Sequence, residues 1–227
     1  MKKVLPLLLS ALVCAALPRA QAAEDRATLV KEVDSCEAII REFQLDPATA
    51  IPASVLARAH GIIIINQFKA GFILGIKGGY GVIMVKKPSG HWSLPVLLRA
   101  NDVSLGLQIG AKSVEMIYVL TDEATPRLVF HREFNTGVDA KAVIGPHAAE
   151  AENDNHPLVN APILVYSKST GLFAGATVKA GTLSRDDDDN YLLYNTTSTM
   201  PELLYSDWVT PPPEVQPLMV FMQKIAP

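Results

Sequence analysis

The sequence lacks the residue patterns on which most enzyme sites depend. It contains no Gly-x-Ser-x-Gly segment, so the tight turn that presents a hydrolase serine is missing. Its five histidines include no pair one helical turn apart, which excludes a zincin site. Its glycines match neither Gly-x-Gly-x-x-Gly nor the P-loop. We therefore expect a non-enzymatic protein without catalytic residues, bound metal or cofactor. The alternative that stays open is a hydrolase whose site has no recognisable motif.

The sequence also lacks an apolar run long enough for a membrane-spanning helix. Its most apolar stretch, residues 4–16, falls short of the roughly 18 residues that such a helix needs. Two lysines precede this stretch and the small-x-small pattern Ala20-Gln21-Ala22 follows it, as in a secretory signal. We interpret residues 1–22 as a signal peptide and expect a periplasmic or secreted protein, peripheral on a membrane, that begins near Ala23. An ordinary N-terminal helix is the alternative interpretation.

Cysteine is scarce. Beyond the expected signal, Cys36 is the single cysteine, so no intramolecular disulfide can form even in an oxidising compartment. We interpret Cys36 as a small buried apolar residue rather than a reactive thiol. Cys14, inside the signal, offers lipidation as an alternative N-terminus, although the bulky Val13 before it suits a lipoprotein peptidase poorly.

An excess of positive charge is missing as well. The chain has 20 basic and 23 acidic residues, and loss of residues 1–22 leaves 17 and 23, a net charge of −6. Nucleic-acid binders are normally basic, so we do not expect a nucleic-acid partner. The apolar content of 49% is sufficient for a folded core. The length after the signal, about 200 residues, suits one domain.

Apolar residues at helical spacing mark residues 25–43. Their intervals of three and four place them on one stripe, which predicts an amphipathic helix. They are Leu29, Val33, Cys36, Ile40 and Phe43. Residues 52–59 predict a second, short helix, because Pro52 suits a first helical turn.

After residue 60 the pattern changes to that of strands. Residues 62–65 are four isoleucines, which are typical of a strand buried on both faces. Residues 69–85 predict a glycine-rich hairpin, whose glycines need a close backbone neighbour. Residues 103–110 alternate apolar and small or polar side chains, as a half-buried strand does. We predict a single α+β domain with a curved antiparallel sheet or small β-barrel-like core and the N-terminal helix packed on it.

The C-terminal part carries polar and proline-rich features. Four aspartates at residues 186–189 suggest calcium, but Tyr191 stands where an EF-hand loop needs glycine. We favour a solvated loop or a helix N-terminus, where acids complement the dipole. His147 and His156 are interpreted as parts of a polar loop rather than metal ligands. Pro211-Pro212-Pro213 predicts an extended tail, so the domain is expected over residues 23–209 and the tail over 210–227.

Lysines cluster in and beside the glycine-rich hairpin. They are Lys69, Lys77, Lys86 and Lys87, and Trp92 follows a turn. Lysines beside an aromatic residue are typical of contact with a membrane surface. The alternative is that they are edge-strand lysines, which protect a sheet against aggregation.

Several separated segments carry a family resemblance. In chain order they are Lys69-Ala70-Gly71-Phe72, the glycines up to Gly81-Val82, Trp92-Ser93-Leu94-Pro95, Gly106-Leu107-Gln108-Ile109-Gly110, Ala161-Pro162-Ile163, Tyr166-Ser167 and Gly171-Leu172-Phe173-Ala174-Gly175. These segments resemble the SYLF domain, also called the Las17-binding-protein or actin-regulator domain. The resemblance extends over residues 27–205 with the segments in the right order.

The resemblance implies a lipid-binding domain. Eukaryotic members join phosphoinositide membranes to actin assembly with the help of an N-terminal amphipathic helix, and secreted bacterial members are associated with phospholipid binding. The resemblance points to Lys69 and to the 25–43 helix. Lys86, Lys87 and Trp92, which lie near the turn, are added on physical grounds. The candidate lipid-binding residues are Leu29, Val33, Ile40, Phe43, Lys69, Lys86, Lys87 and Trp92.

The charge of the 25–43 helix departs from the expectation for a lipid-docking helix. Residues 24–43 carry six acids and three bases, whereas a helix that docks on anionic lipid has a basic polar face. Whether the apolar stripe contacts lipid or packs on the sheet therefore stays open. We expect a phospholipid membrane surface as partner, with an envelope protein as a further one. Actin is not expected, because a secreted protein does not meet it. The alternative function is a protein-interaction scaffold of the cell envelope, with the 210–227 tail as a candidate binding segment.

Overall fold

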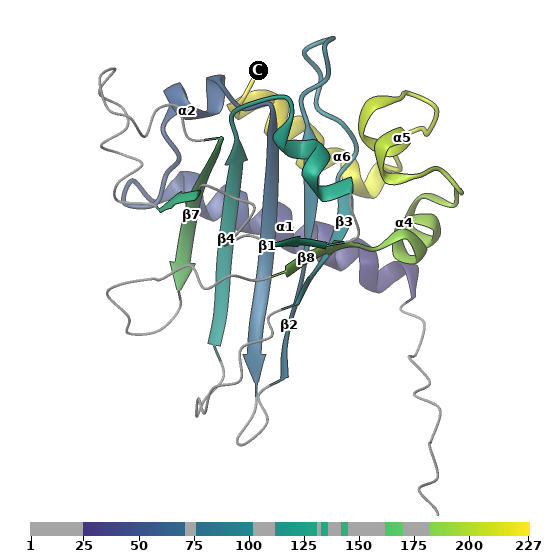
Figure 1. Cartoon of the computed structure of the whole chain (residues 1–227), viewed down its shortest axis with the longest axis horizontal. Helices are drawn as coiled ribbons and strands as arrows, with labels where there is room; N and C mark the ends of the chain where they lie inside the picture. Colours follow the sequence, from purple (N-terminus) through teal and green to yellow (C-terminus); the bar gives the residue numbers. More distant parts are fainter. Residues whose placement is uncertain are drawn as a thin grey trace, which may run out of the picture.

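The computed structural model describes residues 25–70, 76–101, 112–130, 133–135, 142–144, 162–169 and 182–227 (Figure 1). Its helices are α1 (Arg26–Leu45), α2 (Ala53–Ala57), α4 (Asp187–Tyr194), α5 (Met200–Tyr205) and α6 (Gln216–Ile225), with the 3-10 helices η1 (Thr125–Phe130) and η3 (Pro213–Val215). Its strands are β1 (Gly61–Ala70), β2 (Ile76–Val85), β3 (Val96–Asn101), β4 (Lys112–Leu120), β5 (Glu133–Asn135), β6 (Ala142–Ile144), β7 (Ile163–Ser169) and β8 (Thr182–Arg185). The predicted α+β fold is confirmed.

The described strands form one sheet in the order β5-β8-β3-β2-β1-β4-β7-β6. Neighbouring strands are antiparallel except β6 and β7, which are parallel. The two outer strands, β5 and β6, do not pair with each other in this order, so the described part is an open sheet and not a closed barrel. β1 lies near the centre. The hairpin predicted within residues 69–85 is wrong in its extent, because residues 76–85 form the single strand β2, whose antiparallel partner is β1 with the isoleucines of residues 62–65.

Helix α1 forms where the sequence predicted it and packs on one face of the sheet. The Asp25 carboxylate accepts a hydrogen bond from the Thr28 backbone N–H at 2.7 Å, which caps the helix N-terminus. In Figure 1, α1 lies behind the strands. The Cys36 thiol donates to the Ile64 carbonyl at 3.7 Å, and the Tyr80 hydroxyl donates to the Ser35 hydroxyl at 3.1 Å. These contacts place α1 over β1 and β2.

The centre of the sheet shows why the chain has isoleucines and glycines here. The four isoleucines of residues 62–65 are completely buried, as expected for a strand covered on both faces. On the neighbouring strand β2, a Cβ atom at Gly79 would lie 2.7 Å from the Asn66 carbonyl oxygen, and a Cβ at Gly81 would overlap the Ile64 carbonyl oxygen. The prediction that these glycines need a close backbone neighbour is therefore confirmed for both positions.

The C-terminal segment differs from the prediction. Residues 210–227 are not an extended tail, because they contain η3 and α6, and α6 buries Leu218 and Met222. The Arg41 guanidinium stacks over the Phe221 ring at 4.1 Å, which joins α6 to α1. The prolines start these helical turns, a position that tolerates their missing N–H, and apolar spacing in residues 215–226 then favours burial.

Other predictions have different outcomes. The acids of residues 186–189 form the N-terminus of α4, with Asp186 as its cap, so the helix interpretation is confirmed. Across the described part of the chain, no group of three or more potential ligand side chains is arranged to hold a metal. The described helices include none with the length and apolar character needed to cross a bilayer. The signal peptide, the 103–110 strand and the loop with His147 and His156 lie outside the described residues.

Candidate functional site

The apolar stripe of α1 is turned toward the sheet. Leu29 and Ile40 are completely buried, and Val33 and Phe43 are each only 1% exposed. The open question of packing or lipid contact is thus answered for the folded arrangement, in which the stripe packs into the core. Lipid contact through these four residues would require α1 to leave the sheet, and it stays a prediction.

The register of the sheet brings together three lysines, of which the sequence resemblance had indicated one. Lys69 of β1 lies directly opposite Lys77 of β2, and on its other side it lies directly opposite Lys112 of β4. We call Lys77, Lys69 and Lys112 the lysine row. Like charges at directly opposite positions destabilise a sheet. By contrast, Lys168 of β7 lies opposite Glu115 of β4.

The lysines after β2 belong to a different place and are engaged within the protein. Lys86 donates a hydrogen bond from Nζ to the Pro227 carbonyl oxygen. Lys87 Nζ donates to the Ser206 carbonyl oxygen at 2.9 Å and to Asp207 Oδ1 at 2.5 Å. These two lysines therefore hold the C-terminal segment against the turn that follows β2.

Trp92 occupies the interior of this junction. Its side chain is 3% exposed, and its indole Nε1–H donates to the Ala226 carbonyl oxygen at 2.8 Å. The Gln223 side chain contacts the same turn, accepting from the Trp92 backbone N–H at 3.4 Å and donating to the Gly90 carbonyl at 3.2 Å. Trp92 thus anchors α6 and presents little of its ring to solvent. Its proposed contact with lipid stays a prediction.

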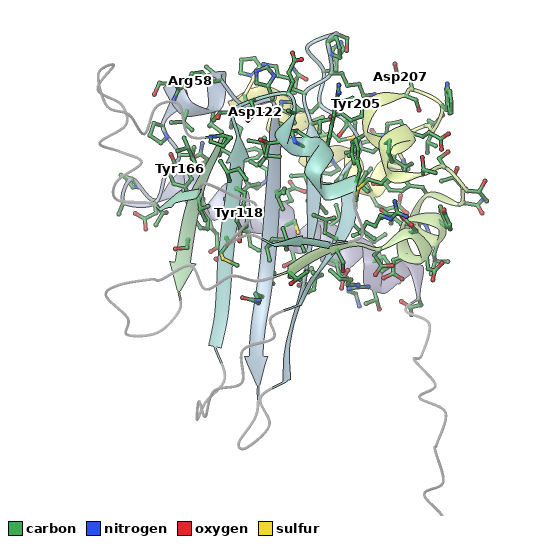
Figure 2. All side chains as sticks on the ribbon, viewed as in Figure 1. Arg58, Tyr118, Asp122, Tyr166, Tyr205 and Asp207 are labelled. Carbon is green, nitrogen blue, oxygen red and sulfur yellow. The ribbon has the colours of Figure 1, made fainter. Side chains whose placement is uncertain are left out.

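A groove of about 540 Å³ lies between the turn after β2 and the C-terminal segment. Trp92, Met219 and Val220 contribute apolar lining, whereas Lys87, His91 and Asp207 contribute ionisable groups. We call this space the C-terminal groove. Figure 2 places Asp207 on the loop after α5, far from the lower ends of β1, β2 and β4 that carry the lysine row.

A cluster of ionised groups joins Glu32 of α1 to β3 and α4. The Arg99 guanidinium pairs with Glu32 Oε1 at 2.8 Å, with Asp186 Oδ2 at 2.7 Å and with Asp189. Burial, followed by the hydrogen bond and charge of Asp186, raises the pKa of Asp189 to about 6. The cluster holds three carboxylates around one cation, and its place between three packed elements indicates a structural role.

Two further exposed apolar residues were not predicted as functional. Trp208 is 75% exposed and lies between Asp207 and Val209, which both line the C-terminal groove, and Val220 of α6 is 68% exposed. The sequence signal for Trp208 is its position as an aromatic residue between α5 and the prolines of residues 211–213. Lys112 is recognisable only from strand register.

Comparison with known proteins supplies the family. A model described as Ysc84, Las17-binding protein actin regulator, matches residues 101–225, which is more than half of the chain. The chain belongs to this family. The matched segment reaches to the end of α6, so the family's pattern includes the helix that the sequence analysis took for a tail.

The relatives extend the similarity to the N-terminal half. An SH3 domain-containing protein of Schizosaccharomyces pombe is 33% identical over 172 residues, covering 74% of this chain and 40% of its own length. LAS seventeen-binding protein 3 of Saccharomyces cerevisiae is 30% identical over 179 residues, covering 78% and 39%. The human SH3 domain-containing YSC84-like protein 1 is 28% identical over 191 residues, covering 82% and 55%. The chain thus spans about half or less of the length of these relatives.

Proposed function

We propose that this member of the Ysc84 family binds phospholipid at a membrane surface and does so through the lysine row. The observation that carries the proposal is the register that sets Lys69 opposite a lysine on both neighbouring strands. Three lysines at opposite positions of neighbouring strands concentrate positive charge that an anionic surface attracts. Each lysine near such a surface contributes about 1 kcal/mol of binding free energy.

We further propose that the protein works in the periplasm or outside the cell and that its task is binding rather than catalysis. The support for the location is the signal-like pattern of residues 1–22. The support for binding is that the family model and the yeast relative are both named for binding another protein. The expectation that actin is no partner rests on the signal pattern alone, and co-sedimentation of residues 23–227 with filamentous actin tests it.

Flotation with vesicles tests the phospholipid proposal. The vesicles consist of phosphatidylcholine with or without phosphatidylglycerol, and the test protein carries Lys69→Ser and Lys112→Ser. We expect the double variant to bind the anionic vesicles about 30-fold more weakly, which corresponds to two lysines at about 1 kcal/mol each. The matched control carries Lys31→Ser and Lys224→Ser, which remove two exposed lysines from α1 and α6. Equal loss in both variants, or no binding of the unmodified protein, would overturn the proposal.

A second candidate function is the binding of a protein partner in the cell envelope. It is favoured by the printed name of the yeast relative, LAS seventeen-binding protein 3. Cross-linking in cells separates the two functions, because a protein-interaction scaffold retains one stoichiometric partner after detergent extraction. A lipid-binding protein loses its association when detergent dissolves the membrane.

A further inference from the structure

We propose that the C-terminal groove binds a zwitterionic phospholipid headgroup, with the phosphate beside Lys87 and His91 and the ammonium beside Asp207. This inference rests on the proposed function, to which it adds a second class of headgroup. The groove and the lysine row are formed by different residues at different ends of the sheet, so each can be tested without the other.

The anion-binding side of the groove is formed by Lys87 and His91. The Lys87 ammonium has three N–H donors, of which two are used by Ser206 and Asp207. The directions of these two hydrogen bonds fix the direction of the third N–H. The Lys87 side chain lies in the groove lining with 12% of its surface exposed. His91 lines the same space and is exposed. A phosphate oxygen would therefore meet a cation that is already held in position.

The cation-binding side is formed by Asp207, which is unusually exposed. The Asp207 side chain is 90% exposed, and the hydrogen bond and charge of Lys87 hold the pKa of its carboxyl below the usual value. The carboxylate thus stays ionised at neutral pH. An ionised carboxylate that lines the groove attracts an alkylammonium by direct ionic attraction. The next residue, Trp208, is also exposed but is not among the residues that line the groove.

The apolar lining of the groove suits the glycerol and first methylene groups of a lipid. It is formed by Trp92, Met219 and Val220, and the hydrogen bond from Trp92 to Ala226 fixes its shape. The volume of about 540 Å³ falls within the range of about 300–1,000 Å³ that is typical of ligand sites. Apolar lining with a few placed polar groups is also the usual composition of such sites.

The pattern of charge favours a zwitterion over an anionic lipid. Lys87 and Asp207 form an ion pair, so the groove presents a positive and a negative pole close together. A zwitterionic headgroup can lie antiparallel to this pair and contact both poles with opposite charge. An anionic headgroup without an ammonium would make no favourable contact with the Asp207 carboxylate and would be repelled by its charge.

Nuclear magnetic resonance titration with soluble dihexanoylphosphatidylcholine tests the proposal without a membrane. We expect shifts of the Lys87, His91 and Asp207 backbone amides. Asp207→Asn is expected to weaken binding about fivefold, as loss of one exposed ionic contact worth about 1 kcal/mol does. The matched control is Asp188→Asn, which changes an exposed acid elsewhere.

The outcomes separate this inference from the proposed function. Dihexanoylphosphatidylglycerol, which lacks the ammonium, should bind more weakly than the choline lipid. Equal binding of the two lipids, unaltered binding by Asp207→Asn, or shifts outside the groove would overturn the groove assignment. If the lysine-row variant loses vesicle binding but keeps the titration, both proposals hold. Binding to anionic vesicles without any groove shifts refutes the groove alone, and groove shifts without vesicle binding refute the lysine row alone.

Discussion

The charge cluster around Arg99 leads to a prediction about stability and pH. Asp189 has an ordinary pKa of 3.8 in the unfolded chain and a pKa of about 6 in the folded protein. Between these values the folded state binds more protons than the unfolded state, so the free energy of unfolding falls as pH rises through this window. The difference corresponds to about 2–3 kcal/mol at 1.36 kcal/mol per pH unit, all of which is lost by pH 7.

Asp189→Asn mimics the protonated carboxyl, because asparagine is neutral and of similar shape. We expect this variant to unfold with about 1–3 kcal/mol more stability than the unmodified protein at pH 7, and with no gain at pH 4. Urea unfolding at several pH values measures the difference, with Asp188→Asn as the control on the exposed side of the same helical turn. A loss of about 3–5 kcal/mol at pH 7, as from a broken buried ion pair, would refute the reasoning. A difference that does not change with pH would refute it as well.

Three further predictions concern the core and its junction with α6. Gly81→Ala should cost more than about 3 kcal/mol of unfolding free energy, because its Cβ would overlap the β1 backbone. Gly90→Ala changes a residue that has a φ of 82° and open space around it, and it should cost only about 1 kcal/mol of unfolding free energy. Equal losses of stability for the two glycine variants in thermal unfolding would contradict this account. Trp92→Phe should cost about 1–3 kcal/mol and speed hydrogen exchange in α6, since the Ala226 carbonyl loses its buried donor; unchanged exchange would argue against the anchor. Burial raises the pKa of the Cys36 thiol, so Ellman's reagent at pH 8 should label this thiol only after denaturant is added. Rapid labelling of Cys36 in the native protein would show that α1 opens.

Periodicity predicted the elements that are determined by their local sequence. The stripe in α1, the four isoleucines of β1 and the acids that begin α4 each follow from a short stretch of sequence. The C-terminal helix was missed because three consecutive prolines suggested extended backbone and outweighed the apolar spacing after them. In the structure these prolines precede or begin η3, where the missing N–H has no cost.

The candidate sites depended on contacts that no local pattern shows. The resemblance to the family indicated Lys69, but its neighbours Lys77 and Lys112 are set by the pairing of β1 with β2 and with β4, which follows β1 only after two other strands. Lys87 and Trp92 flank one turn, as the sequence shows, yet their partners come from residues 206–226, more than a hundred positions away. A sequence pattern therefore identifies a charged turn but cannot show whether solvent or another segment covers it.

The positions of the two proposed lipid contacts have a consequence for how the protein would meet membranes. Lys77 stands near the start of β2 and Lys87 just beyond its end, so an extended strand separates them by about 30 Å. One flat bilayer cannot touch both ends of such a strand when it lies along the membrane normal. A molecule that uses both contacts would therefore link two lipid surfaces, and a mixture of anionic and zwitterionic vesicles should cluster when the protein is added. Clustering measured by light scattering should vanish on changing either Lys69 with Lys112 or Asp207 alone, while binding to one vesicle type persists. If each change weakens binding to the same vesicle and no clustering occurs, the two contacts must lie on one membrane-facing surface, and the strand must lie flat on the bilayer.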